Sequence, residues 1–151
     1  MGAVEFSVPT VFGWQRAGYD RRSGRHFERE GTKRVKDEVR GEFIRACPEG
    51  TKFPLYGPHV PVVVTVDTHR PLPKSKPKRV LLEPDTVKPD IDNIAKLVLD
   101  ALTGLAYADD AQVVEVHVTK WARGRNGGER TEVRVERGWE PKGRITTDGR
   151  G

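Results

Sequence analysis

The middle of the chain contains two acidic residues and one lysine close together in sequence. Side chains of these types can act on a phosphate ester. The three residues are Asp90, Asp92 and Lys96, in the run Lys88-Pro-Asp-Ile-Asp-Asn-Ile-Ala-Lys96. Carboxylate oxygens suit Mg²⁺, and an ammonium group can stabilise negative charge that builds up on a transferring phosphate or help to orient an attacking water. These residue types therefore favour metal-assisted hydrolysis of a phosphodiester.

A second acidic pair, Asp109-Asp110, follows in the short connection after the same segment. We expect this connection to fold back, so that its carboxylates lie beside Asp90 and Asp92. Carboxylates that gather in one place raise each other's pKa unless a cation holds them together. Because no His or Cys accompanies these aspartates, the pattern indicates a hard divalent cation such as Mg²⁺.

A helix over about Asp92 to Leu102 must present these groups. Its apolar residues share one stripe at helical spacing, and the stripe continues just past the helix end. The stripe consists of Ile94, Val98, Ala101, Leu102 and Leu105. Asp92 and Lys96 fall on the opposite face, while Asp90 lies just before the helix, where Pro89 keeps the chain extended. The spacing thus predicts two carboxylates and one ammonium together at a helix N-terminus.

Each of these features also has a purely structural interpretation. Asp90 or Asp92 alone is compatible with a helix N-cap, and Asp92 with Lys96 is compatible with a surface ion pair. Asp109-Asp110 is also compatible with an ordinary turn. Lys96 has a second possible partner in Asp100, which we interpret as a surface or boundary residue.

The rest of the chain predicts one α+β domain, a mixed or antiparallel sheet packed against two main helices. An amphipathic helix with Val35, Val39 and Phe43 on its apolar face should end at Pro48. Alternating or β-branched residues predict the strands. The expected strands are Val4 to Val8, Val60 to Thr68, Val113 to Trp121 and Thr131 to Glu136. The last two should form a hairpin through 122–130, which contains Asn126-Gly-Gly.

Basic residues exceed acidic ones, 27 to 22, which gives a net charge of +5 and favours a polyanionic partner. They concentrate in an arm that leads into the first helix and in a proline-rich stretch at 69–79 that cannot be helical. We expect these clusters to contact DNA phosphates, although each side chain is also compatible with a solvated surface. The candidate DNA contacts in these clusters are Arg16, Arg21, Arg22, Arg25, Lys74, Lys76, Lys78 and Arg79.

Several classes of protein are disfavoured. The chain has no run of 18 apolar residues, which argues against a membrane span, and we expect a cytoplasmic, intracellular protein. Its single cysteine, Cys47, cannot form an internal disulfide or a thiolate zinc cluster. The loops and motifs of nucleotide hydrolases, dinucleotide oxidoreductases, zinc proteases and serine hydrolases are absent.

The segments Lys88 to Lys96, Leu99 to Leu102 and Asp109 to Val113, with Lys120, resemble the RusA family of Holliday junction resolvases of bacteria and their phages. The resemblance covers about residues 86–121. It implies a homodimeric endodeoxyribonuclease of DNA recombination and repair that needs Mg²⁺ or Mn²⁺. Asp90, Asp92 and Asp110 match the family's metal-binding acids and Lys96 its catalytic lysine, with Asp109 as an auxiliary acid. The resemblance also implies that the basic arm and Lys120 are part of a DNA-contacting surface.

On this basis the hypothesis is an enzyme domain over residues 1–138, followed by a flexible tail over 139–151. One or two Mg²⁺ ions would deliver hydroxide in line, leaving 5′-phosphate and 3′-hydroxyl ends at paired nicks in a four-way DNA junction. A dimer is required for symmetric nicks, and Leu99 is a candidate for its interface. The alternatives are a nuclease for flaps or other branched DNA and a basic DNA-binding protein without catalytic activity.

Overall fold

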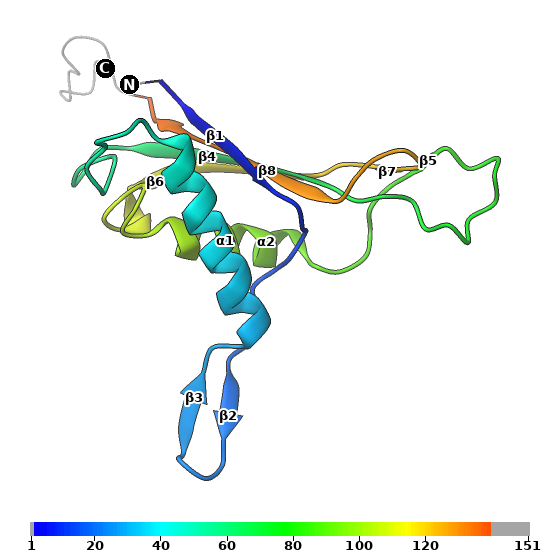
Figure 1. Cartoon of the computed structure of the whole chain (residues 1–151), viewed down its shortest axis with the longest axis horizontal. Helices are drawn as coiled ribbons and strands as arrows, with labels where there is room; N and C mark the ends of the chain where they lie inside the picture. Colours follow the sequence, from blue (N-terminus) through cyan, green and yellow to red (C-terminus); the bar gives the residue numbers. More distant parts are fainter. Residues whose placement is uncertain (1, 140–151) are drawn as a thin grey trace, which may run out of the picture.

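The computed structural model describes residues 2–139, and these form an α+β domain with a mixed sheet and two helices, as the sequence predicts (Figure 1). In chain order the elements are β1 (Val4–Val8), β2 (Gly18–Asp20), β3 (Arg25–Phe27), α1 (Glu30–Ala46), β4 (Val62–His69), β5 (Leu82–Glu83), α2 (Ile91–Leu102), the 3₁₀ turn η1 (Asp110–Gln112), β6 (Val113–Lys120), β7 (Arg123–Gly124) and β8 (Arg130–Arg137).

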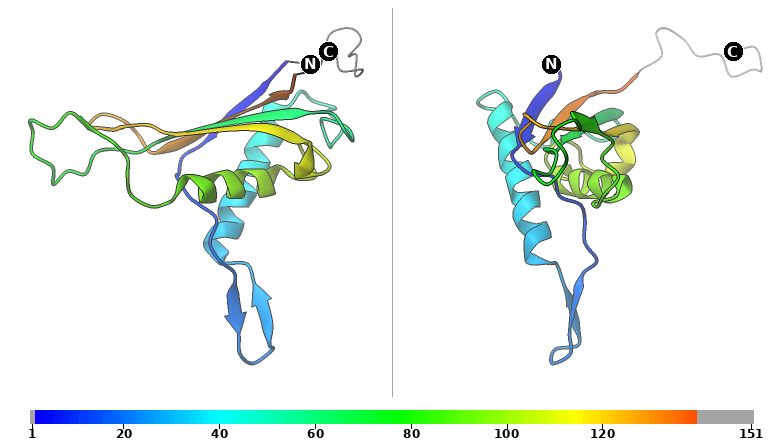
Figure 2. Two further views of the ribbon diagram at one scale, coloured as in Figure 1. Left: turned by 180° about the vertical axis from the view of Figure 1, so that it is seen from behind. Right: turned by 90° about the vertical axis from the view of Figure 1, so that its right-hand side faces the viewer.

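The main sheet has the strand order β1-β8-β4-β6. β8 pairs antiparallel with both β1 and β4, whereas β6 runs parallel to β4. Both helices lie against the same face of this sheet (Figure 2). α1 packs against β1 and α2, and α2 packs against β6. Among the described residues, 2–139, no helix covers the opposite face of the sheet.

The core lies between the helices and the sheet because the apolar residues repeat at the right periods. In β4 the alternate residues Val62, Val64 and Val66 are fully buried, which is the period of two that a strand requires. In α1 the buried residues Val35, Val39 and Phe43 recur every four positions. The apolar stripe of α2 belongs to the same core cluster as these residues, so this helix cannot rotate without exposing apolar surface.

The predicted hairpin through residues 122–130 is wrong. β6 and β8 do not pair, because β4 lies between them in the sheet. The connection instead leaves the sheet and contributes β7, which pairs antiparallel with β5. β8 pairs with the side of β4 that faces away from β6, so the connection has to pass the end of β4 before the chain re-enters the sheet as β8.

Two projections extend from this body. The predicted basic arm is a two-stranded hairpin, β2 with β3, whose tip stands well clear of the helices (Figures 1 and 2). The second projection is formed by residues 70–83 with β7, and it continues beyond the end of the main sheet. It contains no helix among its described residues, as the prolines require.

The predicted C-terminal tail begins at Trp139, which is exposed. The remainder of that tail, 140–151, lies outside the described residues.

Among the residues that the structure describes, neither helix combines the length and apolar character that crossing a membrane would need.

Candidate active site

Helix α2 presents the predicted site on the face that it turns away from the core. The predicted stripe residues Ile94, Val98, Ala101 and Leu102 are buried in this helix, and so is Leu97. At 100° per residue, the first, fifth and ninth residues counted from Asp92 stack along the opposite face. These are Asp92, Lys96 and Asp100; the first two are exposed and the third is half-buried. The burial of the stripe therefore fixes the direction in which all three point.

Asp90 is the N-cap residue of α2, yet its carboxylate does not cap the helix. Its backbone carbonyl accepts the first helical hydrogen bond, from the Ile94 amide at 3.1 Å. The side chain instead pairs with Lys88 Nζ at 2.7 Å, and both groups are largely exposed. Asp92 has no hydrogen-bond or ion-pair partner among the described residues. Neither carboxylate is thus committed to a helix cap.

Lys96 takes a partner that the sequence did not indicate. Its ammonium lies over the Trp14 ring, 4.3 Å from the centroid, instead of pairing with Asp92 or Asp100. Trp14 is held in place because its backbone amide donates to the Asn93 carbonyl at 2.8 Å. A cation over an aromatic face is attracted to it without losing its charge. Lys96 is therefore restrained and still available to an anion.

A capped turn carries Asp109 and Asp110. The Asp109 carboxylate accepts from the Ala111 amide at 2.9 Å, and the Gln112 side-chain carbonyl accepts from the Asp109 amide at 3.1 Å. Buried Gln112 also donates to the carbonyls of Gly57 at 2.8 Å and Val60 at 3.1 Å. The turn is consequently pinned to the body, with Asp110 exposed at its start.

The charges around Asp110 are unfavourable to its ionisation. Reduced hydration, together with Asp109 and Asp100, raises the pKa of the Asp110 carboxyl, while Lys96 acts in the opposite direction. Since Asp100 and Lys96 act on it electrostatically, the turn comes near the outer face of α2. The side chains of α2 that influence Asp110 are Asp100 and Lys96. The predicted placement of its carboxylate beside Asp90 and Asp92 remains a prediction.

A divalent cation suits this donor chemistry. Asp90, Asp92 and Asp110 are exposed carboxylates, and the raised pKa of Asp110 marks a place where a cation would relieve repulsion. In the part of the chain that the structure describes, no three acidic, His or Cys side chains are already gathered in the manner of a metal site. The assignment of the three aspartates to a metal remains a prediction.

Comparison with known protein families gives a match over most of the chain. The model of the family described as Endodeoxyribonuclease RusA matches residues 9–136, and this span holds both acidic pairs and Lys96. The chain belongs to the RusA family. It is also similar to the uncharacterised protein YqaN of Bacillus subtilis (strain 168), with 46% identity over 70 residues. That alignment covers 40% of this chain and 49% of YqaN, so the chain matches about half of the length of this relative.

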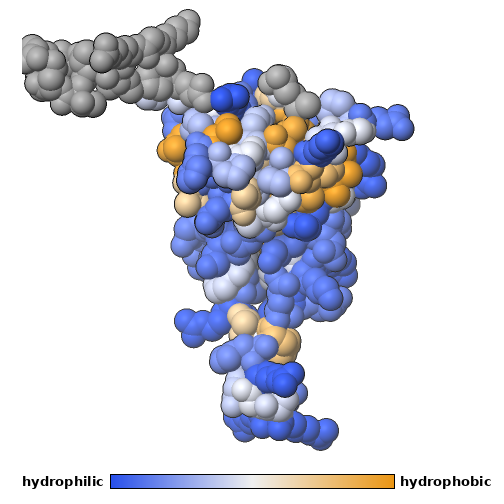
Figure 3. All heavy atoms as spheres, turned by 90° about the vertical axis from the view of Figure 1, so that its left-hand side faces the viewer, coloured by the Kyte–Doolittle hydropathy of each residue, from blue (hydrophilic) through white to orange (hydrophobic). Residues whose placement is uncertain are grey.

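The RusA fold of this chain separates the predicted DNA contacts into two groups. Arg21, Arg22 and Arg25 lie around the tip of the β2–β3 hairpin and Arg16 precedes it, all exposed. Within the described residues, the side chains of Arg21, Arg22 and Arg25 have no acidic or hydrogen-bonding partner. The end of the molecule that carries this hairpin is mainly hydrophilic but includes a hydrophobic patch (Figure 3), and Tyr19 and Phe27 of the hairpin are both exposed.

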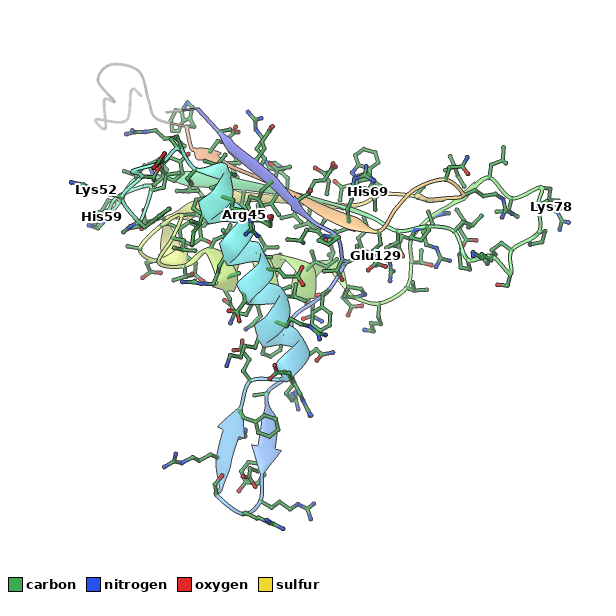
Figure 4. All side chains as sticks on the ribbon, in the orientation of Figure 1. Arg45, Lys52, His59, His69, Lys78 and Glu129 are labelled. Carbon is green, nitrogen blue, oxygen red and sulfur yellow. The ribbon has the colours of Figure 1, made fainter. Side chains whose placement is uncertain are left out.

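The second group lies on the other projection. Lys74, Lys78 and Arg79 are exposed, and Lys78 marks the far end of this arm, remote from Lys52 (Figure 4). Lys76 differs, because its ammonium is paired with Glu83 at 3.1 Å. Arg125 donates to the carbonyls of Lys76 and Pro77 and holds the loop against the connection that leads to β8.

Lys120 lies apart from both groups. Its ammonium donates to the carbonyls of Val87 at 2.6 Å and Pro89 at 2.9 Å, directly before Asp90. Arg70 and Asp85, which the sequence did not single out, join the same network. Gln112 was also missed, but Asp109-x-x-Gln112 carries the spacing of a capping box. No local signal reveals the roles of Arg70, Asp85 or Trp14.

Proposed function

We propose that this RusA-family protein is a divalent-metal-dependent endodeoxyribonuclease that resolves four-way DNA junctions by paired nicks. The observation that carries the proposal is the family match over residues 9–136, which includes Asp90, Asp92, Lys96 and Asp110 on one helix and the turn that follows it. Two basic projections beside an acidic site fit a protein that must hold DNA and still bring carboxylates to its backbone.

Asp90, Asp92 and Asp110 are the residues that would hold the metal. When bound, a divalent ion supplies an activated water and offsets charge on the phosphate, which leads to 5′-phosphate and 3′-hydroxyl products. Lys96 would bind a non-bridging phosphate oxygen, because its ammonium is restrained by Trp14 and close enough to Asp110 to lower the pKa of that carboxyl. Arg21, Arg22 and Arg25 would bind phosphates further along a junction arm.

A homodimer is part of the proposal, and the exposed edge of β6 is the surface that we assign to it. β6 is an edge strand of eight residues, and its valines Val114 and Val116 are 57% and 38% exposed. An uncovered edge of this length with apolar residues invites pairing with another strand. Ile91, Ala95 and Leu99 follow one another at four-residue spacing on α2, which packs against β6, and none of them is fully buried.

Charge complementarity selects the register of this pairing. If β6 meets a second β6 antiparallel about Val116, Glu115 of each copy lies opposite His117 of the other, and Val114 lies opposite Val118.

Disulfide crosslinking tests this register. Val116→Cys, in a Cys47→Ser background, should form a disulfide-linked dimer on mild oxidation, because directly paired residues lie about 5 Å apart. Val118→Cys is the matched control, because its two copies would be separated by about 14 Å. A monomer at micromolar concentration, or a crosslink at position 118 alone, would refute this interface.

A cleavage assay tests the activity. The protein is incubated with a synthetic four-way junction, a flap, a nicked duplex and a linear duplex, with and without Mg²⁺, and the nicks are mapped. We expect symmetric, ligatable nicks on the junction that need the metal and disappear in Asp92→Asn. Cleavage of flaps in preference to junctions would favour the alternative nuclease. Junction binding without metal-dependent cleavage of any substrate would leave only a DNA-binding role.

A further inference from the structure

The segment that leads into α2 has no regular structure of its own, yet it carries Asp90. Between β5, which ends at Glu83, and α2, which begins at Ile91, the chain forms neither helix nor strand. A loop of this kind is ordinarily mobile, and a mobile loop is a poor support for a metal ligand. Something outside the segment must therefore fix it.

Asp85 provides the first attachment point. Its side chain is 0% exposed, although the residues on either side of it are exposed. A buried carboxylate needs a cation and a full set of hydrogen bonds. Arg70 supplies them in a two-pronged contact, with Nε donating to one oxygen at 2.9 Å and Nη2 to the other at 2.5 Å.

Arg70 does more than neutralise Asp85. Its other donors reach the carbonyls of Val87 at 3.2 Å and Lys88 at 2.8 Å. Lys120 adds bonds to the carbonyls of Val87 and Pro89. Three successive carbonyls, those of residues 87–89, are thus held by two cations, and the last of the three belongs to the peptide unit that joins Asp90.

The sheet brings the two cations together. Arg70 directly follows β4, and Lys120 is the last residue of β6, which runs parallel to β4 with Thr68 opposite Lys120. The carboxyl ends of parallel neighbours meet at one edge of a sheet, so these cations arrive side by side. Lys120 and Arg70 both lower the pKa of Asp85 against the raising effect of its burial, which fits one connected network.

We propose that Arg70, Asp85 and Lys120 are positioning residues that set the backbone before Asp90 and so aim this carboxylate for metal binding. The proposal rests on the assignment of Asp90 to the metal in the proposed function. It gives Lys120 a role in the support of the site in place of the direct DNA contact that the sequence suggests. Replacement of residues that hold a metal ligand in position without touching the metal typically lowers metal affinity or activity by about 10 to 100-fold.

Arg70→Lys is the decisive variant because it keeps the charge but loses the two-pronged contact and the bonds to two carbonyls. We expect Mn²⁺ affinity, measured by electron paramagnetic resonance titration without DNA, to fall by about tenfold. Junction affinity without metal should change less than twofold. The backbone amide signals of Asp90 and Ile91 should shift in nuclear magnetic resonance spectra, while those of β1 and β8 stay in place.

Arg123→Lys is the matched control. Arg123 forms an ion pair with Glu83 close by, but it makes no bond to the carbonyls of residues 87–89. We expect its Mn²⁺ affinity to remain within twofold of that of the unaltered protein. Equal losses in the two variants, or an unchanged Mn²⁺ affinity in Arg70→Lys, would overturn the proposal.

Lys120→Met separates positioning from DNA contact. A positioning role predicts weaker Mn²⁺ binding with junction affinity and its salt dependence unchanged. A phosphate contact predicts the opposite, a decrease of about one in the slope of log affinity against log salt with Mn²⁺ binding intact, and would overturn the role of Lys120. If the unaltered protein binds Mn²⁺ but cuts no DNA, the proposed function fails while the Mn²⁺ titrations still decide the positioning role.

Discussion

Arg70 and Arg21 carry the same charge, but their surroundings make them act in opposite ways. Arg70 gives its donors to Asp85 and to backbone carbonyls, and most of its side chain is buried. Arg21 stands at the tip of the β2–β3 hairpin, with no side-chain partner among the described residues. A saturated guanidinium holds the protein in shape, whereas an unsaturated one is left to bind a phosphate.

Two aspartates, Asp85 and Asp110, also differ in their surroundings. Asp85 is buried and paired, and its pKa is lowered by Arg70 and Lys120 in spite of its burial. Asp110 is exposed, and its pKa is raised by reduced hydration and by the neighbouring Asp109 and Asp100. The first carboxylate is paired with an arginine, whereas the second has no ion-pair partner among the described residues. The network around Asp85 and the acid group around Asp110 can therefore be told apart by experiment.

The largest effect should come from breaking the supporting network. Asp85→Asn leaves Arg70 without its carboxylate, and we expect the free energy of unfolding at pH 7 to fall by about 3 kcal/mol. Because the pKa of Asp85 is lowered in the folded state, its stabilisation is present above its ordinary value and is lost as pH falls through the lowered one. Urea denaturation across this range checks the prediction, and a loss that is independent of pH would contradict it.

Asp110→Asn tests the acidic residues around Asp110, and DNA cleavage is the measurement. Loss of a metal-binding carboxylate should reduce junction cleavage by about 100-fold or more, because the activation of water depends on the metal. Junction binding should persist or tighten, since a negative charge is removed. Single-turnover cleavage and a binding titration on the same preparation measure the two effects. Unchanged cleavage would remove Asp110 from the site.

The unpartnered arginines give the next prediction. Replacement of Arg21, Arg22 and Arg25 by Gln should weaken junction binding by about tenfold or more. The slope of log affinity against log salt should become shallower by about three, one for each lost phosphate contact. The melting temperature should not change, because these side chains hold no part of the fold. The triple variant Lys74→Gln, Lys78→Gln, Arg79→Gln compares the second projection directly. A lowered melting temperature in the hairpin variant would show that its arginines are structural.

Trp14→Leu should have a smaller effect on cleavage. The change removes the aromatic face under Lys96 but keeps an apolar side chain, and a cation–π contact at a partly exposed site contributes about 1 kcal/mol. We therefore expect cleavage to fall about fivefold. In a Lys96→Met background the same change should have no further effect, because the two residues act as a pair. Additive losses would show that Trp14 acts independently of Lys96.

The smallest effect concerns stability without metal. Because the pKa of Asp110 is raised in the folded state, its ionised form opposes folding at neutral pH, and this penalty disappears as pH falls through the raised value. Asp110→Asn should accordingly stabilise the metal-free protein at pH 7 by a few tenths of a kcal/mol and have no effect in acid. Thermal melts at the two pH values test this. Added Mg²⁺ should raise the melting temperature of the unaltered protein more than that of the variant.

Much of this protein can be predicted from local patterns. The apolar stripe of α2 fixes which way Asp92 and Lys96 point, and the alternation in β4 predicts a strand with one buried face. The α+β class and the RusA family follow from the sequence and are confirmed by the fold and the family match. These features depend on neighbours within a few residues of each other, and sequence spacing records such neighbours directly.

Contacts between distant segments could not be predicted in this way. Three such contacts join parts of the chain that are far apart in sequence. β4 lies between β6 and β8, and Trp14 lies under Lys96. Arg70 and Lys120 donate hydrogen bonds to the backbone carbonyls of residues 87–89. An arginine or lysine in a sequence shows its charge but not which acceptors will surround it. The sequence alone determined which groups could do the chemistry. The tertiary structure decided which cations are held by acceptors within the protein and which are not, because that choice depends on burial and on partners that only folding brings together.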